Sequence, residues 1–343
     1  MDAAWDPMSL SDYVLLGVAS GVFAINSIIY ICIFFNDKKF LPFRTKNTAM
    51  MGFGLVASIL WWYGSFFNQG GMLSVQSLNM CRFMGYWLRW ALGGFALLAI
   101  LLYRTLIYYQ IFIRKRPARN GWIYLTPLLV YLPGLVIVIL PTAMTSLLTA
   151  QRVGDVSYCV SQTPVVVVTW AYCTLVLVTL GFLSSRIRHV KATFNEFREM
   201  LWTIGPIIVA LLVSGGLSSS DYQHTFWARL ICNIFNLIAA CAFFWAVYGG
   251  CFIGFLFNRQ KYLARFAHSL AKDGFQSMGS ERTSSITESG PYIEKPSYYI
   301  SASQLPPPNF HILANMPVLT KFADSDVRIP SISDPVNGRH LIA

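Results

Sequence analysis

Apolar residues in this chain gather into seven long windows separated by short polar segments. The windows cover residues 13–35, 48–67, 83–106, 121–143, 163–185, 201–219 and 227–257. Each contains the ~20 residues that a helix needs to cross the hydrocarbon core of a bilayer. Lipid offers the backbone no hydrogen-bond partners, so an open sheet is excluded. The pattern predicts an all-α membrane protein built as a seven-helix bundle.

The composition agrees with a membrane fold. Hydrophobic residues make up 55% of the 343 residues and charged ones only 12%, too few to cover the surface of a soluble protein of this length. The first window is not a cleavable signal peptide, because its flank is acidic rather than basic. We predict three parts: an extracellular segment 1–12, a membrane domain 13–257, and a cytoplasmic Ser/Thr/Pro-rich disordered tail 258–343.

Basic residues are concentrated in alternate polar segments. They follow the first, third, fifth and seventh windows: Lys38, Lys39, Arg44 and Lys46; Arg114, Lys115, Arg116 and Arg119; Arg186, Arg188, Lys191 and Arg198; Arg259, Lys261 and Arg265. By the positive-inside rule, we expect the N-terminus outside and the C-terminus in the cytosol of a plasma-membrane protein. The net charge of +11 is then mainly a topology signal, and nucleic acid is not an expected partner.

Two of the seven cysteines fall outside the apolar windows, apart from the other five. Cys81 precedes the third window and Cys159 lies between the fourth and fifth. Both are expected in an oxidising compartment, where cysteines commonly pair. We predict a disulfide bond between them; the alternative is two unpaired loop thiols.

Arg89 lies about two turns into the third window, a costly depth for a charge that is neither paired nor hydrated. One interpretation is a snorkelling side chain or a structural ion pair with an outer acid such as Asp12, Asp155 or Asp221. The other is a contact to a polar or anionic ligand. Nearby aromatic residues offer a candidate ligand pocket around Arg89: Trp61, Trp62, Tyr86, Trp90 and Trp170. The alternative for each aromatic residue is helix packing or the interfacial belt.

Several chemical classes are disfavoured. No lysine occurs between 192 and 260, so the seventh window cannot form a retinal Schiff base. The windows carry no acid except at their ends, where proton relays and cation transporters usually need them inside. We find no phosphate-binding loop, no metal-ligand spacing and no nucleophile–base pair. We therefore expect no enzyme activity, no cofactor and no metal.

The segment 187–202 interrupts the apolar pattern with dense charge. Its apolar residues recur at intervals of 3 and 4, which predicts one stripe along a helix: Ile187, Val190, Phe194, Phe197 and Leu201. The helix is expected to extend the fifth or sixth window beyond the membrane. It is either a connector held to inner-leaflet lipid or a docking surface for a cytoplasmic partner.

A family resemblance rests on four stretches in the same order along the chain. They are SDYV (11–14), FRTKN (43–47), LLYRTLIYYQIFIRKRP (101–117) and RHVKATFNEFREMLW (188–202). Together they resemble the seven-helix membrane proteins of plants and fungi that carry a regulator of G-protein signalling domain. The residues after Phe257 are too few, and too rich in Ser, Thr and Pro, for that domain. Its GTPase-accelerating activity is therefore not expected here.

The resemblance implies a G-protein-coupled receptor whose inner segments contact a Gα subunit. The residues expected to face the G protein are Arg104, Arg114, Lys115, Arg116, Arg186, Arg188, Lys191, Phe194, Glu196 and Arg198. Arg104 has no acidic neighbour in sequence and the last window lacks NPxxY, so a rhodopsin-like switch is not expected. The alternative for Arg104 is a snorkelling side chain.

Two further expectations concern the tail and the partners. Phosphorylation is predicted at Thr283, Ser284, Ser285 and Thr287, against the alternative of a tail that binds nothing. The predicted partners are a heterotrimeric G protein α subunit, an extracellular small ligand such as a nutrient, and membrane lipids. The alternative functions are a seven-helix solute transporter or channel, and a Gα-binding scaffold that does not signal.

Overall fold

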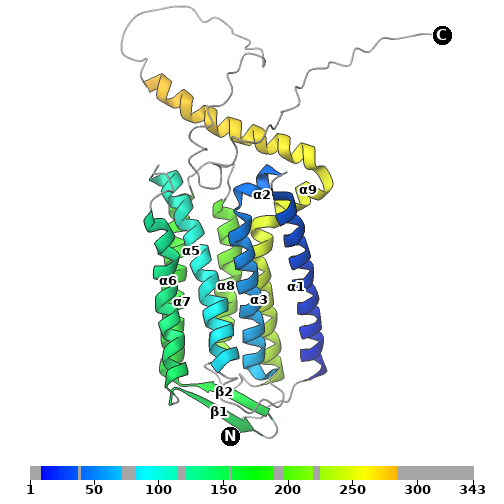
Figure 1. Ribbon diagram of the computed structural model, residues 1–343, viewed down its shortest axis with the longest axis vertical. Coiled ribbons are helices and arrows are strands. Elements are labelled where there is room, and N and C mark those ends of the chain that lie inside the picture. Colours follow the sequence, from blue (N-terminus) through cyan, green and yellow to red (C-terminus); the bar gives the residue numbers. More distant parts are fainter. Residues whose placement is uncertain are drawn as a thin grey trace, which may run out of the picture.

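The computed structural model describes residues 9–37, 40–71, 82–114, 121–144, 146–153, 156–188, 196–218 and 225–284. Within them, seven helices are long and apolar enough to cross a membrane. They run side by side as one bundle (Figure 1). Each helix falls on one of the seven predicted windows, so the seven-helix all-α class is confirmed.

The helices follow one another along the chain with short connections. The first is α1 (Leu10–Asn36), and the second is α3 (Thr48–Phe66) with a π-helical end, η2 (Phe67–Gly71). The third is continuous through η3 (Arg82–Phe95), α5 (Ala96–Tyr108) and η4 (Tyr109–Ile113), of which η3 and η4 are π-helical. The remaining four are α6 (Gly121–Ala143), α7 (Thr163–Ile187), α8 (Glu196–Ser218) and α9 (Phe226–Ser284).

Two small elements mark the opposite ends of the bundle (Figure 1). An antiparallel hairpin, β1 (Leu148–Val153) and β2 (Val156–Ser161), closes one end, which we call the hairpin end. The short helix α2 (Leu41–Thr45) lies at the other end. We call this the basic end, because the first, third and fifth helices end there, next to the basic segments of the sequence. The sequence analysis did not predict the hairpin.

The second and third helices form the centre of the bundle. In their most apolar stretches 61% and 67% of residues are buried, against 22%, 17% and 28% for α1, α6 and α7. Helices α1, α6 and α7 turn large apolar side chains outward, including Phe35, Val136 and Leu175. Such an extensive exposed apolar surface is typical of contact with lipid. The core is therefore made where α3 and the third helix meet.

Two glycines allow α3 and η3 to approach at backbone distance. A Cβ atom on Gly64 would lie 2.5 Å from the backbone nitrogen of Arg89. One on Gly93 would lie 2.5 Å from the Cα of Trp61. Small residues are common where membrane helices associate, because packing rather than the hydrophobic effect drives that association. This crossing fixes the depth at which Arg89 and Trp61 lie.

A buried tryptophan joins α3 to α9. The indole N–H of Trp62 donates to the backbone carbonyl of Asn233 at 3.0 Å, and its ring is fully buried. Phe66 stacks on it with ring centroids 5.3 Å apart, and Phe23 of α1 meets it edge-on at 5.6 Å. The polar edge of Trp62 is thus satisfied inside the bundle, as buried indoles require.

The last helix bends where the sequence analysis placed the start of the tail. Asn258, with φ −154° and ψ 58°, interrupts α9, and the part beyond crosses the end of the bundle (Figure 1). The kink falls at the predicted boundary between the membrane domain and the tail, although α9 itself continues to Ser284. Tyr262 and Leu263 pack against the core from this extension. Residues 285–343, the rest of the predicted tail, lie outside the described residues.

We predict that Gly93→Ala destabilises the protein, because its methyl group collides with the backbone of α3; overpacking of this kind costs about 1–3 kcal/mol. The matched control is Gly181→Ala in α7, where a Cβ meets nothing within 4 Å. That variant should be neutral or more stable by up to about 1 kcal/mol, as expected for alanine in a helix. Thermal unfolding in nanodiscs, followed by a thiol-reactive dye, measures both. Equal midpoints for the two variants would contradict the proposed close crossing.

Candidate functional site

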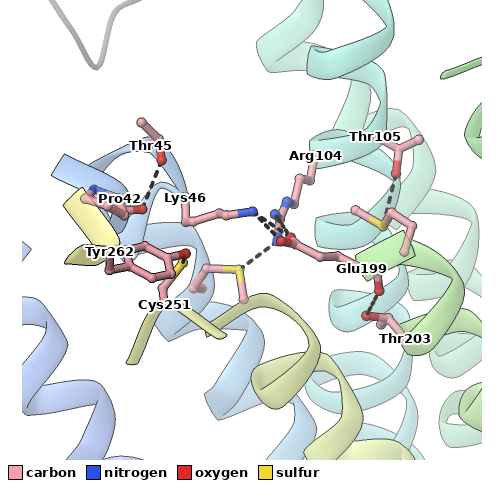
Figure 2. Close-up of polar contacts among 11 residues, drawn as sticks. Pro42, Thr45, Lys46, Arg104, Thr105, Glu199, Thr203, Cys251 and Tyr262 are labelled. Carbon is pink, nitrogen blue, oxygen red and sulfur yellow. Dashed lines mark hydrogen bonds and ion pairs between the residues drawn. The ribbon is translucent and has the colours of Figure 1, made fainter. Parts of the chain in front are cut away.

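Three charged side chains from three helices meet at the basic end of the bundle. Lys46 lies in the turn between α2 and α3, Arg104 in α5, and Glu199 in the first turns of α8 (Figure 2). Arg104 is 5% exposed, Lys46 10% and Glu199 20%. We call these three residues the ion cluster. It links segments that are 58 and 95 residues apart in the sequence.

Glu199 is the centre of the cluster and accepts from both cations. The ammonium of Lys46 lies 2.6 Å from Oε1 and 2.7 Å from Oε2. The guanidinium of Arg104 donates through Nη2 to Oε2 at 3.2 Å. Charge-assisted hydrogen bonds of this kind are stronger than neutral ones, particularly where water is partly excluded. One carboxylate therefore holds the second, third and sixth helices together.

Neighbouring side chains orient the two ends of the Arg104–Glu199 pair. Nη1 of Arg104 lies 3.4 Å from the sulfur of Met51, and its guanidinium lies 5.6 Å from the Tyr108 ring centroid. The Thr203 hydroxyl donates to the backbone carbonyl of Glu199 at 2.9 Å (Figure 2). These contacts come from three of the helices that the cluster joins. The pair is held in place from both sides rather than loosely on the surface.

An aromatic cluster fixes the turn that carries Lys46. Phe40 and Phe43 of the α2 region meet at 4.7 Å between ring centroids, and Phe255 of α9 lies 5.2 and 5.4 Å from them. Asn47 follows with a positive φ of 54°, and its side chain accepts from the Met50 N–H. Left-handed geometry is well tolerated by asparagine. The position of Lys46 is therefore set by packing against α9.

The cluster ties helices together through one carboxylate, which two cations share. Removing one partner from a buried pair is strongly destabilising, because the other charge is left uncompensated. Separating α8 from α5 therefore requires a replacement partner for Arg104.

Arg104 was the one member of the ion cluster that the sequence singled out. The snorkelling alternative for it is wrong, because its side chain is buried and paired with Glu199. Lys46 and Glu199 were not predicted as site residues. The available signal was an acid just before the sixth window and an arginine inside the third. Pairing them requires knowing that α5 and α8 are neighbours.

The other residues predicted to face a G protein are only partly described. Arg114, Arg186, Arg188 and Arg198 are exposed at the basic end. Arg186 lies over the Phe182 ring at 5.0 Å. Lys115, Arg116, Lys191 and Phe194 lie outside the described residues, and nothing is known of the Glu196 side chain beyond its place in α8. The predicted helix over 187–202 is seen at its two ends, in α7 to Ile187 and in α8 from Glu196.

A second ion pair closes the opposite end of the bundle. Nη2 of Arg229 in α9 lies 3.3 Å from Oδ2 of Asp12 in α1, and each side chain is 3% exposed. Asp12 also accepts from the backbone N–H of Ser9 at 2.9 Å. Asp12, one of the three acids considered as a partner of Arg89, therefore pairs with Arg229 instead. Asp155 and Asp221, the other acids considered, lie outside the described residues.

The predicted ligand-pocket residues all lie in the interior of the bundle or at its edge. Trp61 and Trp90 line a small hollow of about 10 Å³, the space of one water molecule. Trp62 instead packs on α9, and Trp170 lies against Gly215 of α8. The Tyr86 hydroxyl donates to the Ser161 hydroxyl of β2 at 2.5 Å. Helix packing therefore accounts for Trp62 and Trp170.

Two further predictions fall on residues that the structure does not describe. Cys81 lies outside the described residues, and the side chain of Cys159 in β2 is likewise not described. The disulfide bond between them remains a prediction. Thr283 and Ser284 are the last residues of α9, while Ser285 and Thr287 lie beyond it. Phosphorylation at these four positions also remains a prediction.

Comparison with known proteins adds no family to this description. The chain matches no model of a known protein family. No curated protein matches its sequence.

We predict that Glu199→Gln lowers the unfolding midpoint, because it leaves Arg104 buried without a counter-charge, at a cost of about 3–5 kcal/mol for a fully buried pair and less here. The double variant Arg104→Gln/Glu199→Gln should be more stable than the sum of the single variants, giving a coupling of at least about 1 kcal/mol. Thermal unfolding in nanodiscs measures all three.

The control for this cycle is Arg186→Gln paired with Glu199→Gln, since Arg186 is exposed and not part of the cluster. These two changes should add without coupling. Additive behaviour of Arg104 and Glu199 would mean that their ion pair contributes nothing to the fold.

Proposed function

We propose that this chain is a seven-helix receptor that transmits an extracellular signal to a heterotrimeric G protein. The proposed orientation places the hairpin end outside the plasma membrane and the basic end in the cytosol. The observation that supports this function is the ion cluster, because it ties three helices together at the end where a G protein would bind. The positive-inside rule supports the orientation.

The proposed mechanism is a shift between two packings of the basic end. With Glu199 bound to Arg104 and Lys46, α8 is held against α5 and α3, and the Arg104 guanidinium is covered. Movement of α8 away from α5 breaks both ion pairs and uncovers that guanidinium. Carbonyl or carboxylate groups of a Gα subunit would then replace Glu199 as its partner. A partner that binds only the open packing shifts the population toward it.

The exposed cations around the cluster suit the same partner. Arg114, Arg188 and Arg198 lie on the described surface of the basic end. Complementary charge increases the rate of encounter and sets orientation more than it sets affinity. We therefore assign these arginines to the first contact and Arg104 to the open state alone.

The sequence resemblance points to the same class of protein. The stretch RHVKATFNEFREMLW, which resembles the inner segment of receptors fused to a regulator of G-protein signalling domain, contains Glu199 itself. A nutrient is the ligand that this resemblance favours. A transporter or a scaffold that binds Gα without activating it would use the same helices, and the experiments below separate these functions.

We predict that Glu199→Gln raises ligand-free nucleotide exchange on Gα by about tenfold, within the 5–150-fold range of typical allosteric coupling. Neutralising Glu199 removes the tie that favours the closed packing. The measurement is fluorescent GTP-analogue binding to a panel of purified Gα subunits with βγ, using the full chain in nanodiscs.

The matched control is Asp12→Asn, which removes an acid from the ion pair at the hairpin end. It should lower the unfolding midpoint and leave exchange unchanged. If the parent protein and the Glu199→Gln variant bind Gα but neither changes its nucleotide exchange, the scaffold is favoured. Solute flux in proteoliposomes with no effect on nucleotide exchange would favour the transporter.

We predict that a protease site inserted between Arg188 and Glu196 is cut only from the cytosolic side of the plasma membrane. A site inserted between Val153 and Val156, at the tip of the hairpin, should be cut from outside. Intact cells and inside-out vesicles distinguish the two, with immunoblotting of the fragments as the measurement. Cleavage of the first site in intact cells would contradict the proposed orientation.

A further inference from the structure

Arg89 is a cation in the interior of the bundle, and no carboxylate pairs with it among the residues that the structure describes. It lies in η3, and its titratable neighbours there are Tyr86, Cys173 and Cys232. None of these carries a carboxylate. Arg89 belongs neither to the Asp12–Arg229 pair nor to the ion cluster.

The hydrogen bonding of Arg89 is also incomplete. Its Nε is buried and has no hydrogen-bond partner. The guanidinium lies 4.9 Å from the centroid of the Trp90 ring, a cation–π contact that covers one face of the group. Buried donors are almost always paired, so an unpaired one indicates strain or a missing partner. Gly64 fixes the backbone of Arg89 at this depth.

A second unpaired donor lies on the helix that faces Arg89. The Asn236 Nδ2 in α9 is buried without a partner. Asn236 follows Cys232 by one turn on the same face of α9, and Cys232 is one of the groups next to Arg89. This region of the bundle therefore holds two buried donors without partners, the Arg89 Nε and the Asn236 Nδ2. One buried acceptor on α9, the Asn233 Oδ1, also has none.

An apolar floor adjoins these donors. The small hollow between the helices is bounded by Trp61 and Trp90 together with Gly94, Leu97, Leu98, Cys173, Ile207 and Leu211. Trp90 and Cys173 contribute both to this floor and to the surroundings of Arg89. A cation at the edge of an apolar hollow is the usual arrangement of a site for an amphiphilic small molecule.

We propose that Arg89 and the hollow beside Trp90 form a binding site for a small organic monoanion. The ligand's carboxylate pairs with the guanidinium, and its apolar body enters the hollow between the third, fifth and sixth helices. A carboxylate suits the planar donor edge of arginine, which binds it through two parallel hydrogen bonds. A single unpaired positive charge matches a single negative one. The apolar floor disfavours a fully hydrated inorganic anion.

The hollow is too small for such a ligand in this packing, so binding must separate the helices around it. Trp61 on α3 and Leu211 on α8 both line it. Glu199 of the ion cluster lies on α8, and Lys46 lies in the turn that leads into α3. A ligand that wedges these helices apart would bias the packing at the basic end. The binding site itself holds for a receptor or a transporter, so it does not depend on the proposed function.

The experiment measures the unfolding midpoint of the full chain in nanodiscs with sodium butyrate or sodium benzoate at constant ionic strength. We expect at least one of them to raise the midpoint saturably, and the matched neutral amides, butyramide and benzamide, to leave it unchanged. Arg89→Gln should raise the half-saturating concentration at least about tenfold. Arg82→Gln, a change of another arginine at the start of η3, should leave it unaltered.

The ligand-free midpoints provide a readout that separates a binding role from a structural one. An arginine kept unpaired for a ligand destabilises the empty protein, so Arg89→Gln and Arg89→Met should unfold at a higher temperature than the parent. A lower midpoint, or failure of both variants to fold, would assign Arg89 a structural role and overturn the proposal.

Three other outcomes would also overturn it. They are no stabilisation by either carboxylate, equal stabilisation of the Arg89 variants, and stabilisation by inorganic phosphate alone. The last would replace an organic ligand by an inorganic ion. None of these results would bear on the exchange assay with Glu199→Gln, so the two proposals can fail separately.

Discussion

A charge inside an apolar helix depends on a partner within the bundle, because lipid cannot solvate it. Arg104 and Arg229 meet this constraint with Glu199 and Asp12, in each case through an acid at the end of another helix. Both pairs lie at the bundle ends, where the acids themselves begin their helices. The arrangement connects α5 to α8 at the basic end and α1 to α9 at the hairpin end. The ends are thus held by charge and the middle by packing.

The middle of the bundle is tightly packed. Gly64 and Gly93 bring α3 and η3 to backbone distance, and Trp62 fastens α3 to α9. Side chains in such a crossing cannot shift without moving whole helices. At the basic end, α8 contacts its neighbours through Glu199 in the ion cluster and through Met200, whose sulfur lies 3.7 Å from the Thr105 hydroxyl. The proposed change in packing breaks the ion pairs of Glu199, and for this reason it is assigned to α8.

Arg89 stands apart from the paired arginines. It is fixed in depth by the glycine crossing, covered on one face by Trp90, and without an acid among the groups around it. A protein that needed only stability would gain from an apolar residue at this position. Stability given up at one interior site is a common sign of a binding site. Its place beside helices that also reach the ion cluster offers a physical route between the two ends.

The sequence by itself determined the seven helices, because a bilayer requires about 20 apolar residues per crossing and that requirement is local. It also identified Arg89 and Arg104 as unusual, since a charge in an apolar window is visible without a fold. It did not reveal the hairpin at residues 148–161 or the helical extension of α9 beyond Asn258, where Tyr262 and Leu263 pack against a core assembled elsewhere. Only the tertiary structure decided the partners. Glu199 lies 95 residues from Arg104, and Asp12 lies 217 from Arg229. Which helices are neighbours depends on shape complementarity at sites such as Gly93. The hydrophobic periodicity of a single segment does not reveal that complementarity.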